Sequence, residues 1–386
     1  MDEKLVLEKI KKSEKVAFAF LEQLVNLDSG DDAKGGIADV CHSIGDFAAA
    51  LGFCVEYITT PNEPTQVLCH RANEGKKKVM FIGHADTVFP KGTTLKRPFK
   101  IVGDKAYGPG VADMKGGLVT ALFTIKALLE AGWEDSEFTF FICGDEELSH
   151  PHTNAVENFM KYAKGQDVCF CMEPGRENGA VVTGRKGAAR PLIKVKGIAS
   201  HAGTAPEKGV SANLELAYKI IELQKLNNRE TGTTFNVGVM KGGFMANIIS
   251  DYAECEVDIR AKTILEAEKA IKDVQRIVET SYLNGTNSVV EANKISFMPF
   301  ETTPQVTRLY NLMKKEASLL GQEELKEMYS GGCSDVAWTA LVGTTSLCGC
   351  GPKGFGAHTD EEYFYTASLV ERMQLLAMTI MHLNQI

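Results

Sequence analysis

The chain has 386 residues, of which 44% are hydrophobic, and a formal net charge of -8 at pH 7. This length and apolar content allow two domains with sizeable cores. The negative charge, and the lack of any Lys/Arg cluster beyond Lys76-Lys77-Lys78, argue against a nucleic-acid-binding surface. We therefore expect a small peptide or another small molecule as partner, and neither nucleic acid nor membrane.

The N-terminus, Met1-Asp2-Glu3-Lys4, carries charge where a secretory signal needs an apolar core, and no later run reaches membrane-spanning length. Most cysteines lie in apolar runs, where thiols act as small hydrophobes, and none forms a Cys-x-x-Cys pair. We expect a cytoplasmic protein without a cysteine zinc site.

The first part of the chain alternates helix and strand patterns, which is typical of an α/β domain. Helices are predicted over residues 5–27, 37–51 and 117–130. Strands are predicted over 54–58, 66–70, 79–82, 138–143 and 167–172, with a hairpin near 100–107. The strand at 79–82 is short and apolar enough to be a buried strand.

Ionisable side chains follow three of these strands and occupy one glycine-rich loop. The ends of strands in open α/β sheets are where ligands bind. Any one of these groups alone has an ordinary explanation, such as a loop histidine or an exposed acidic turn, but their joint occurrence is improbable. The candidate residues are His84, Asp86, Asp113, Glu146, Glu147 and Glu173.

A phosphate-binding loop is the alternative interpretation of the glycine-rich segment 108–117. The segment lacks the Gly-Lys-Ser/Thr ending of such loops, and Asp113 occupies the place where a phosphate would approach. The loop is better suited to bring a carboxylate close to another group.

The pattern changes near residue 184 to strand, helix, strand, strand, helix, strand, the order of a ferredoxin-like split βαβ unit. These elements are predicted over 192–195, 210–226, 234–240, 253–261, 266–282 and 288–295. Helices return at 305–320, 336–341 and 367–383, with a strand at 345–348. We therefore expect a first domain over 1–183 and 299–386 and an inserted domain over 184–298, which leaves His358 available to the same sheet edge.

Two histidines and several carboxylates, without cysteine, match the ligands of paired zinc ions, or of cobalt or manganese. Two metals about 3.5–4 Å apart need a bridging carboxylate, and one further acid must stay off the metals as a base. The adjacent Glu146 and Glu147 can divide these tasks.

Six segments, taken in order, resemble the signature motifs of the M20 family of zinc exopeptidases and amidohydrolases. They are Gly83-His84-Ala85-Asp86-Thr87-Val88, Gly110-Val111-Ala112-Asp113-Met114-Lys115-Gly116-Gly117, Asp145-Glu146-Glu147, Glu173-Pro174, Ala199-Ser200-His201-Ala202-Gly203 and Ala357-His358. The chain is most similar in these motifs to the glutamate carboxypeptidase branch, with acetylornithine and succinyl-diaminopimelate deacylases as relatives.

This resemblance implies a catalytic domain with a mixed central sheet flanked by helices, and a role for each motif residue. Asp113 would bridge two zinc ions. His84 and Glu173 would complete one site, and Glu147 and His358 the other. Asp86 would hold His84, and Glu146 would accept the proton of the bridging water.

The resemblance also implies that the inserted domain is a lid that pairs two subunits into a homodimer. His201 would then support the oxyanion in the partner's active site, while Arg260 and Asn247 would bind the substrate carboxylate. Taken alone, Arg260 is better explained as a surface ion-pair partner and Asn247 as a turn former.

One segment departs from the family pattern. Many relatives have Gly-Ser soon after the paired glutamates, where this chain has Ser149-His150-Pro151-His152. We interpret His150 and His152 as an exposed loop pair rather than as extra metal ligands. Cys333, in a glycine-rich loop, is not expected to be a catalytic thiol.

The expected function is a co-catalytic dizinc hydrolase that cleaves a C-terminal peptide or amide bond, as a carboxypeptidase on N-acyl or peptidyl amino acids such as glutamate. An N-acyl amino acid deacylase or a dipeptidase would use the same residues. A non-catalytic metal-dependent binding protein is the alternative from another class, and the intact set of ligands and base argues against it.

Overall fold

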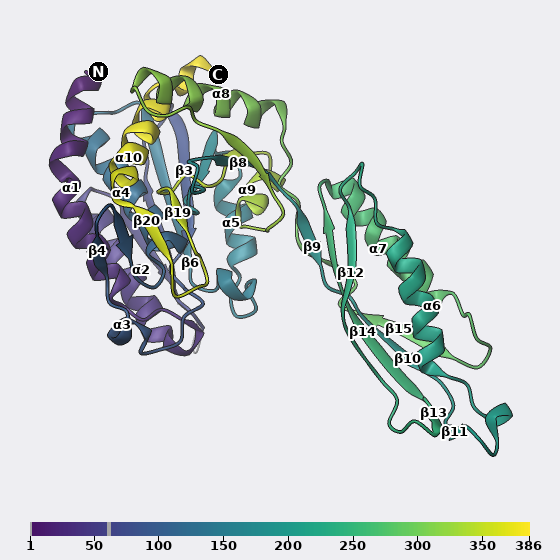
Figure 1. Cartoon of the computed structure of the whole chain (residues 1–386). Helices are drawn as coiled ribbons and strands as arrows, with labels where there is room; N and C mark the ends of the chain where they lie inside the picture. The colour runs from purple at the N-terminus through teal and green to yellow at the C-terminus, as the bar shows by residue number, and fades with distance from the viewer. Residues whose placement is uncertain (1, 60–62) are drawn as a thin grey trace. The chain divides into compact units, whose positions relative to one another are not determined.

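The computed structural model describes residues 2–59 and 63–386 (Figure 1). The chain divides into two compact units, the first formed by Met1–Thr183, Thr302–Tyr329 and Ser334–Ile386, the second by Gly184–Glu301 and Ser330–Cys333.

The chain returns to the first unit at Thr302. Residues 299–301 and 330–333 belong to the second unit because their backbone pairs with its first strands. Phe300 and Arg185 exchange two backbone hydrogen bonds of 2.8 and 3.0 Å, and the amide of Lys186 donates to the carbonyl of Ser330 at 3.0 Å.

The first unit is built on a six-stranded mixed sheet with the order β1-β2-β6-β3-β7-β18. Strands β6, β3, β7 and β18 are parallel to one another. Strand β2 runs antiparallel to both of its neighbours, β1 and β6. The strands are β1 (Cys54–Ile58), β2 (Gln66–Arg71), β3 (Lys77–His84), β6 (Ser136–Cys143), β7 (Val168–Cys171) and β18 (Thr345–Leu347). This confirms the predicted mixed α/β architecture.

Helices cover both faces of this sheet. Figure 1 shows α1, α4 and α10 on one side and α5 and α9 on the other. Strand β3 is buried from Val79 to His84, as expected for a strand covered on both faces. The helices are α1 (Glu3–Val25), α2 (Lys34–Ala50), α4 (Gly116–Glu130), α5 (Ala155–Ala163), α8 (Pro304–Leu319), α9 (Val336–Leu341) and α10 (Thr366–Met381).

Helix α5 is absent from the sequence prediction. It is short, and its buried positions gain their apolar surroundings from β6 and α9 rather than from a long periodic pattern of its own. The short helix α3 (Thr93–Lys96) is also new.

Short strands in the first unit hold the loops around the sheet edge. One sheet has the order β19-β20-β5-β4, and a second pairs β17 with β8. The predicted hairpin at 100–107 is present and turns at Gly103, whose φ is 63°. The strands are β4 (Lys100–Val102), β5 (Lys105–Tyr107), β8 (Val181–Arg185), β17 (Glu327–Ser330), β19 (Gly354–Phe355) and β20 (Tyr363–Tyr365).

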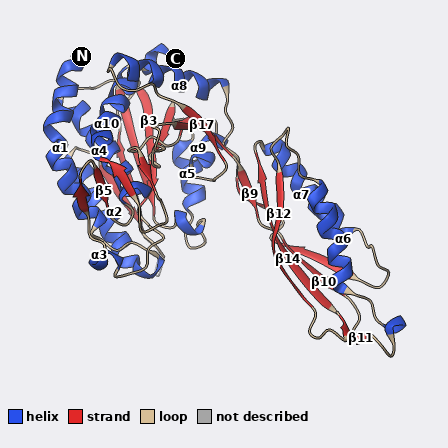
Figure 2. Cartoon of the chain, in the orientation of Figure 1, coloured by secondary structure: helices blue, strands red, loops and turns tan. Residues whose placement is uncertain are grey.

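The second unit has the predicted split βαβ arrangement. Its antiparallel strands follow the order β15-β10-β14-β12, and helices α6 and α7 lie side by side against the sheet (Figure 2). The elements are β10 (Leu192–Lys196), α6 (Ala212–Lys225), β12 (Thr234–Gly242), β14 (Tyr252–Ala261), α7 (Ile264–Glu279) and β15 (Asn287–Glu291). Shorter strands are β9 (Gly187–Ala189), β11 (Ser200–His201), β13 (Ile248–Ile249) and β16 (Ile295–Phe297).

The predicted strand at 288–295 is in fact two strands. Ala292 adopts a positive φ of 52°, which turns the chain between β15 and β16. The β16 segment then pairs with β9 instead of continuing along β10.

No helix in the described ranges is both long and apolar enough to traverse a lipid bilayer. The cytoplasmic location stays a prediction from the sequence.

Candidate metal centre

The carboxyl ends of β3, β6 and β7 carry the predicted ligands to one edge of the sheet. His84 ends β3 and is in register with Cys143, the last residue of β6. Glu146 and Glu147 follow β6, and Glu173 follows β7, which pairs in parallel with β3. The parallel pairing therefore gathers side chains that are far apart in sequence.

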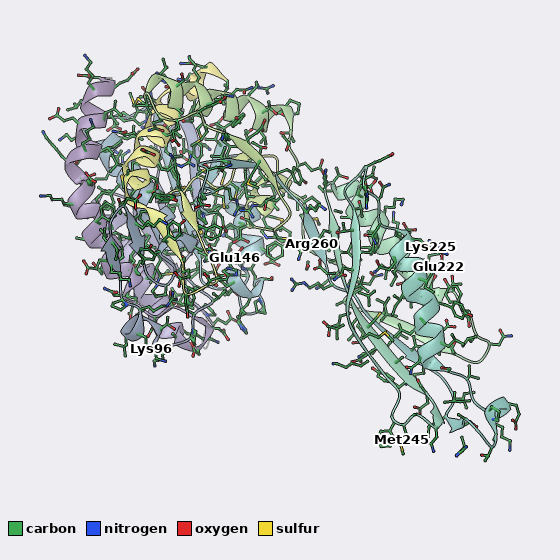
Figure 3. The ribbon with its side chains drawn as sticks, viewed as in Figure 1. Lys96, Glu146, Glu222, Lys225, Met245 and Arg260 are labelled. Carbon is green, nitrogen blue, oxygen red and sulfur yellow. The ribbon has the colours of Figure 1, made fainter. Side chains whose placement is uncertain are left out.

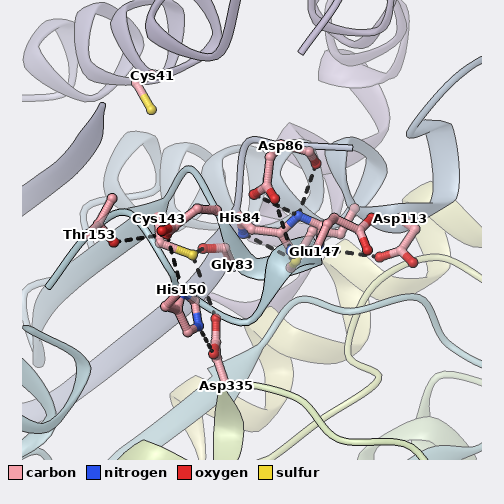
Figure 4. A network of polar contacts seen from close by, with 12 residues as sticks. Cys41, Gly83, His84, Asp86, Asp113, Cys143, Glu147, His150, Thr153 and Asp335 are labelled. Carbon is pink, nitrogen blue, oxygen red and sulfur yellow. Dashed lines mark hydrogen bonds and ion pairs between the residues drawn. The ribbon is translucent and has the colours of Figure 1, made fainter. Parts of the chain in front are cut away.

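Asp113 lies between the two histidines. Its Oδ1 is 3.3 Å from Nε2 of His84 (Figure 4), and its Oδ2 is 3.3 Å from Nε2 of His358. Nε2 of His358 also lies 3.0 Å from Oε2 of Glu147. Each oxygen of one carboxylate thus faces a different imidazole, which is the arrangement that a bridging ligand requires.

Asp86 holds two of these groups from behind. The Nδ1 atom of His84 lies 3.0 Å from the carbonyl oxygen of Asp86 and 3.4 Å from its Oδ1. The Oδ2 atom of Asp86 accepts a hydrogen bond from the backbone N–H of Glu147 at 2.9 Å. Because Nδ1 of His84 is engaged, its Nε2 is directed to Asp113.

Glu146 lies close to several other carboxylates, which affect its pKa. Burial raises its pKa well above the ordinary glutamate value. The charge of His84 lowers this pKa, and three nearby carboxylates raise it: Asp335, Glu173 and Glu147. A cluster of like charges in a buried site requires compensation by a cation or by protons.

Glu362 contacts the candidate site and is not among the residues that the sequence predicts. Its buried carboxylate accepts three backbone hydrogen bonds of 2.9 Å from the loop that carries Asp113, donated by Gly110, Ala112 and Asp113. In the sequence, Glu362 is recognisable only as an acid shortly after His358. The residues around it do not indicate that it contacts the loop of Asp113.

The interpretation of His150 as an exposed residue is wrong. Its side chain is only 2% exposed, and both ring nitrogens contact carboxylates, Asp145 at 3.1 Å and Asp335 at 2.7 Å. His152 is 37% exposed and lies 3.5 Å from Asp31, so the interpretation holds for this residue. The buried pocket formed by two carboxylates explains why His150 leaves the surface.

The remaining candidates lie in the second unit. His201, in β11, accepts hydrogen bonds at Nδ1 from the N–H groups of Gly203 and Thr204. Asn247 is exposed, and its carbonyl accepts from the amide of Ala202.

Arg260, in β14, forms an ion pair with Asp258 at 2.9 Å. Its Nη1 lies 3.1 Å from Sγ of Cys333. Figure 3 labels Arg260 and, in the first unit, Glu146.

Residues 80–382 match the sequence profile of peptidase family M20/M25/M40. The chain belongs to this family. It is 30% identical to Carboxypeptidase G2 from Pseudomonas sp. (strain RS-16) over 376 residues, which cover 94% of this chain and 88% of that protein. It is 26% identical to the acetylornithine deacetylase of Erwinia tasmaniensis over 358 residues, covering 88% and 89% of the two chains.

The fold of this M20 protein is also that of solved family structures. The crystal structure of aminopeptidase PepT from Bacillus cereus aligns with a TM-score of 0.78 at 22% identity, covering 95% of this chain and 98% of the other. The family relationship confirms that the chain is a metal-dependent hydrolase of peptide or amide bonds.

The residues present in this M20 chain fit divalent metal ions. Ligand atoms of His84, Asp113 and Glu147 all lie within 4.8 Å of one another, and the set contains only nitrogen and oxygen donors. Hydrogen bonds to Asp113 and Asp86 raise the pKa of His84 well above its ordinary value, against the lowering effect of burial. The acids therefore attract positive charge to the place where the ions would bind.

Proposed function

We propose that this M20 hydrolase is a co-catalytic dizinc carboxypeptidase acting on N-acyl or peptidyl amino acids such as glutamate. The observation that carries the proposal is the position of Asp113, with one carboxylate oxygen 3.3 Å from each of two imidazoles. A relative named Carboxypeptidase G2, similar over most of the chain, supports the choice of reaction.

In this proposal Asp113 would hold both metal ions, with His84 and Glu173 as further ligands of one ion and His358 and Glu147 as further ligands of the other. Nitrogen and carboxylate ligands without thiolate suit Zn²⁺ and also permit Co²⁺ or Mn²⁺.

Two divalent cations bound here would polarise the scissile carbonyl and acidify a water molecule. Glu146 accepts the proton of that water and returns it to the leaving amine. Burial raises the pKa of Glu146 above that of an ordinary glutamate, which makes it a stronger proton acceptor. Asp86 fixes the ring of His84 and the backbone of Glu147 during the reaction.

Substrate binding is assigned to the second unit. Arg260 would bind the carboxylate of the C-terminal amino acid, for which a planar guanidinium is well suited. Asn247 lies at the opposite end of β14, beside His201, and would reach this carboxylate only from a partner subunit. His201 supports the developing oxyanion in the active site of a partner subunit.

Room for the acyl or peptidyl group is available in the first unit. A cavity of about 660 Å³ is lined by segments that directly follow Glu173 and precede His358, among them Pro174, Gly175 and Phe355. Its volume lies within the range of small-ligand sites.

The proposed homodimer forms through the second unit. Exposed apolar side chains recur on α6 at Leu214 (46%), Tyr218 (42%) and Ile221 (51%), spaced so that they share one face. Strand β12 pairs with β14, and no other described strand bonds its opposite edge. An apolar helix face beside an open strand edge supports pairing with a second copy.

A hydrolysis panel tests the reaction. The purified protein is stripped with a chelator, reconstituted with Zn²⁺ or Co²⁺, and offered N-acyl-glutamate, acetylornithine and dipeptides. Cleavage of N-acyl- or peptidyl-glutamate supports the carboxypeptidase. Acetylornithine as the preferred substrate would replace it with the deacylase, and absence of turnover across the panel would exclude both.

A further inference from the structure

His150 is held between two buried carboxylates near the metal centre (Figure 4). Its Nδ1 lies 3.1 Å from Oδ1 of Asp145, and its Nε2 lies 2.7 Å from Oδ1 of Asp335. The side chains of Asp145 and Asp335 are 1% and 4% exposed. Because an ionised carboxylate can only accept, both ring nitrogens donate, and the imidazole is positively charged.

The contact between His150 and Asp145 closes a turn that contains both functional glutamates. Asp145 precedes Glu146 and Glu147, and His150 follows them. The backbone closes the same turn, because the amide of His150 donates to the carbonyl of Asp145 at 3.0 Å. These contacts therefore enclose the backbone of both glutamates in one closed turn.

Two residues of this turn have unfavourable backbone dihedral angles. Ser149 and His150 have φ values of 67° and 56°, a region that residues with a Cβ rarely occupy. Such backbone persists only where surrounding contacts determine it. Asp145 supplies further contacts, accepting from the amide of His152 at 3.2 Å and from Oγ1 of Thr153 at 2.8 Å.

Asp335 ties the closed turn to a different part of the first unit. It directly precedes α9, and its Oδ2 accepts from Sγ of Cys143, the last residue of β6, at 3.6 Å. The imidazole thus connects the loop after β6 with the start of α9. Without its positive charge, two buried carboxylates would face each other beside Glu146.

We propose that His150 is a positioning residue, a charged imidazole clamp that fixes the turn 145–150 so that Glu146 holds its place as the base, while Asp86 and His358 hold Glu147. His150 touches neither substrate nor metal and acts through Asp145 and Asp335. The catalytic part of this inference rests on the proposed function.

A third metal site is the competing interpretation, since Cys143, His150 and Asp335 also lie close enough to share an ion. The contacts argue against it. Nε2 of His150 is bonded directly to Asp335 at 2.7 Å, and its Nδ1 is taken by Asp145. Neither ring nitrogen is left to coordinate a metal.

The first test needs no substrate. We would record ring ¹⁵N and N–H signals of the metal-loaded protein labelled with ¹⁵N-histidine at pH 8, and assign His150 by comparison with His150→Gln and Asp335→Asn. The expected result is two slowly exchanging ring N–H groups for His150. A neutral ring with a single N–H would overturn the clamp.

The second test compares His150→Gln with His152→Gln, a neighbouring exposed histidine, on the substrate that the panel identifies. We expect His150→Gln to lower kcat by about 10- to 100-fold with KM changed by less than about twofold and metal content unchanged. His152→Gln should match the wild type. Unchanged kcat in folded His150→Gln, or loss of a bound metal ion from it, would overturn the proposal.

A double variant tests whether the two partners act as one unit. Asp335→Asn should lower kcat to a similar degree, and His150→Gln/Asp335→Asn should lose little more than either single variant. Additive losses would contradict the clamp. If no panel substrate is cleaved, the proposed function fails, while the ring signals and the metal content of His150→Gln still decide the clamp.

Discussion

The backbone N–H of Asp113 donates a 2.9 Å hydrogen bond to Oε1 of Glu362, so an acid shortly after His358 fixes the loop that carries Asp113. Replacement by Gln leaves one carbonyl oxygen for three backbone donors. We expect Glu362→Gln to weaken metal binding by about 10- to 100-fold, measured by metal titration of the stripped protein. Glu361→Gln, at an exposed neighbour, is the matched control, and equal affinities in the two variants would contradict the assignment.

Glu146 is expected to be dispensable for metal binding and essential for turnover. Glu146→Gln keeps the size of the side chain but cannot accept a proton. We expect the metal content to stay at the wild-type value and kcat to fall by about 10²- to 10⁴-fold. Elemental analysis and steady-state kinetics on one preparation provide both values, and near-normal turnover would remove Glu146 as the base.

Arg260 and Arg190 offer a paired test of carboxylate binding. Both contact Asp258, Arg260 at 2.9 Å and Arg190 at 3.6 Å. Because a hydrogen bond to a charged group contributes about 1.5–3 kcal/mol, Arg260→Ala should raise KM by about 10- to 100-fold for substrates with a free C-terminal carboxylate. Arg190→Ala should leave KM near the wild-type value. If Arg260→Ala behaved like Arg190→Ala, the substrate-binding assignment would be lost.

The stability of the protein should depend on pH through His150. Burial lowers the pKa of His150, but Asp335 and Asp145 outweigh it and raise the pKa from 6.5 to about 11. The folded state therefore holds a proton that the unfolded chain releases above pH 6.5. This contribution is complete below pH 6.5 and is lost as the pH rises through about 11, by up to about 1.4 kcal/mol per pH unit.

Urea denaturation of the wild type and of His150→Gln at several values between pH 7 and pH 10 measures this effect. The difference in the free energy of unfolding should shrink as the pH rises. A difference that stays constant across this range would show that His150 does not hold the extra proton.

A charge on the exposed face of α6 should dissociate the proposed dimer. Ile221 is 51% exposed on this face, and Met245, labelled in Figure 3, is 54% exposed in the loop after β12. Ile221→Asp should give a folded monomer in light scattering after gel filtration, whereas Lys96→Asp in the first unit should not change the mass. A wild-type monomer would contradict the pairing.

Much of the fold could be predicted because its signals are local. Helix α9 has the predicted bounds, and β3 is found where apolar residues end at Gly83-His84. The grouping of strand-end ligands followed from one property, that parallel strands present the same ends to the same edge. The contacts of Asp113 with both histidines agree with that expectation.

The missed features depend on contacts between distant residues. Glu362 bonds to amides about 250 positions earlier, so its neighbours in sequence carry no trace of its role. Polar loop residues are usually exposed, so the sequence indicates an exposed His150. In the structure, Asp335, 185 positions later, completes a buried site for His150. Burial of a polar group becomes apparent only when its partner is known.

The insertion of the second unit between β8 and α8 separates the proposed metal ligands along the chain. His358 follows Glu173, the proposed ligand before it, by nearly half of the sequence. Asp113 and His84 are therefore synthesised well before His358. The proposed centre can close only after His358 has been synthesised, when the segment that carries it packs onto an already formed sheet. Truncated chains would accordingly lack the closed centre, however well their earlier parts had folded.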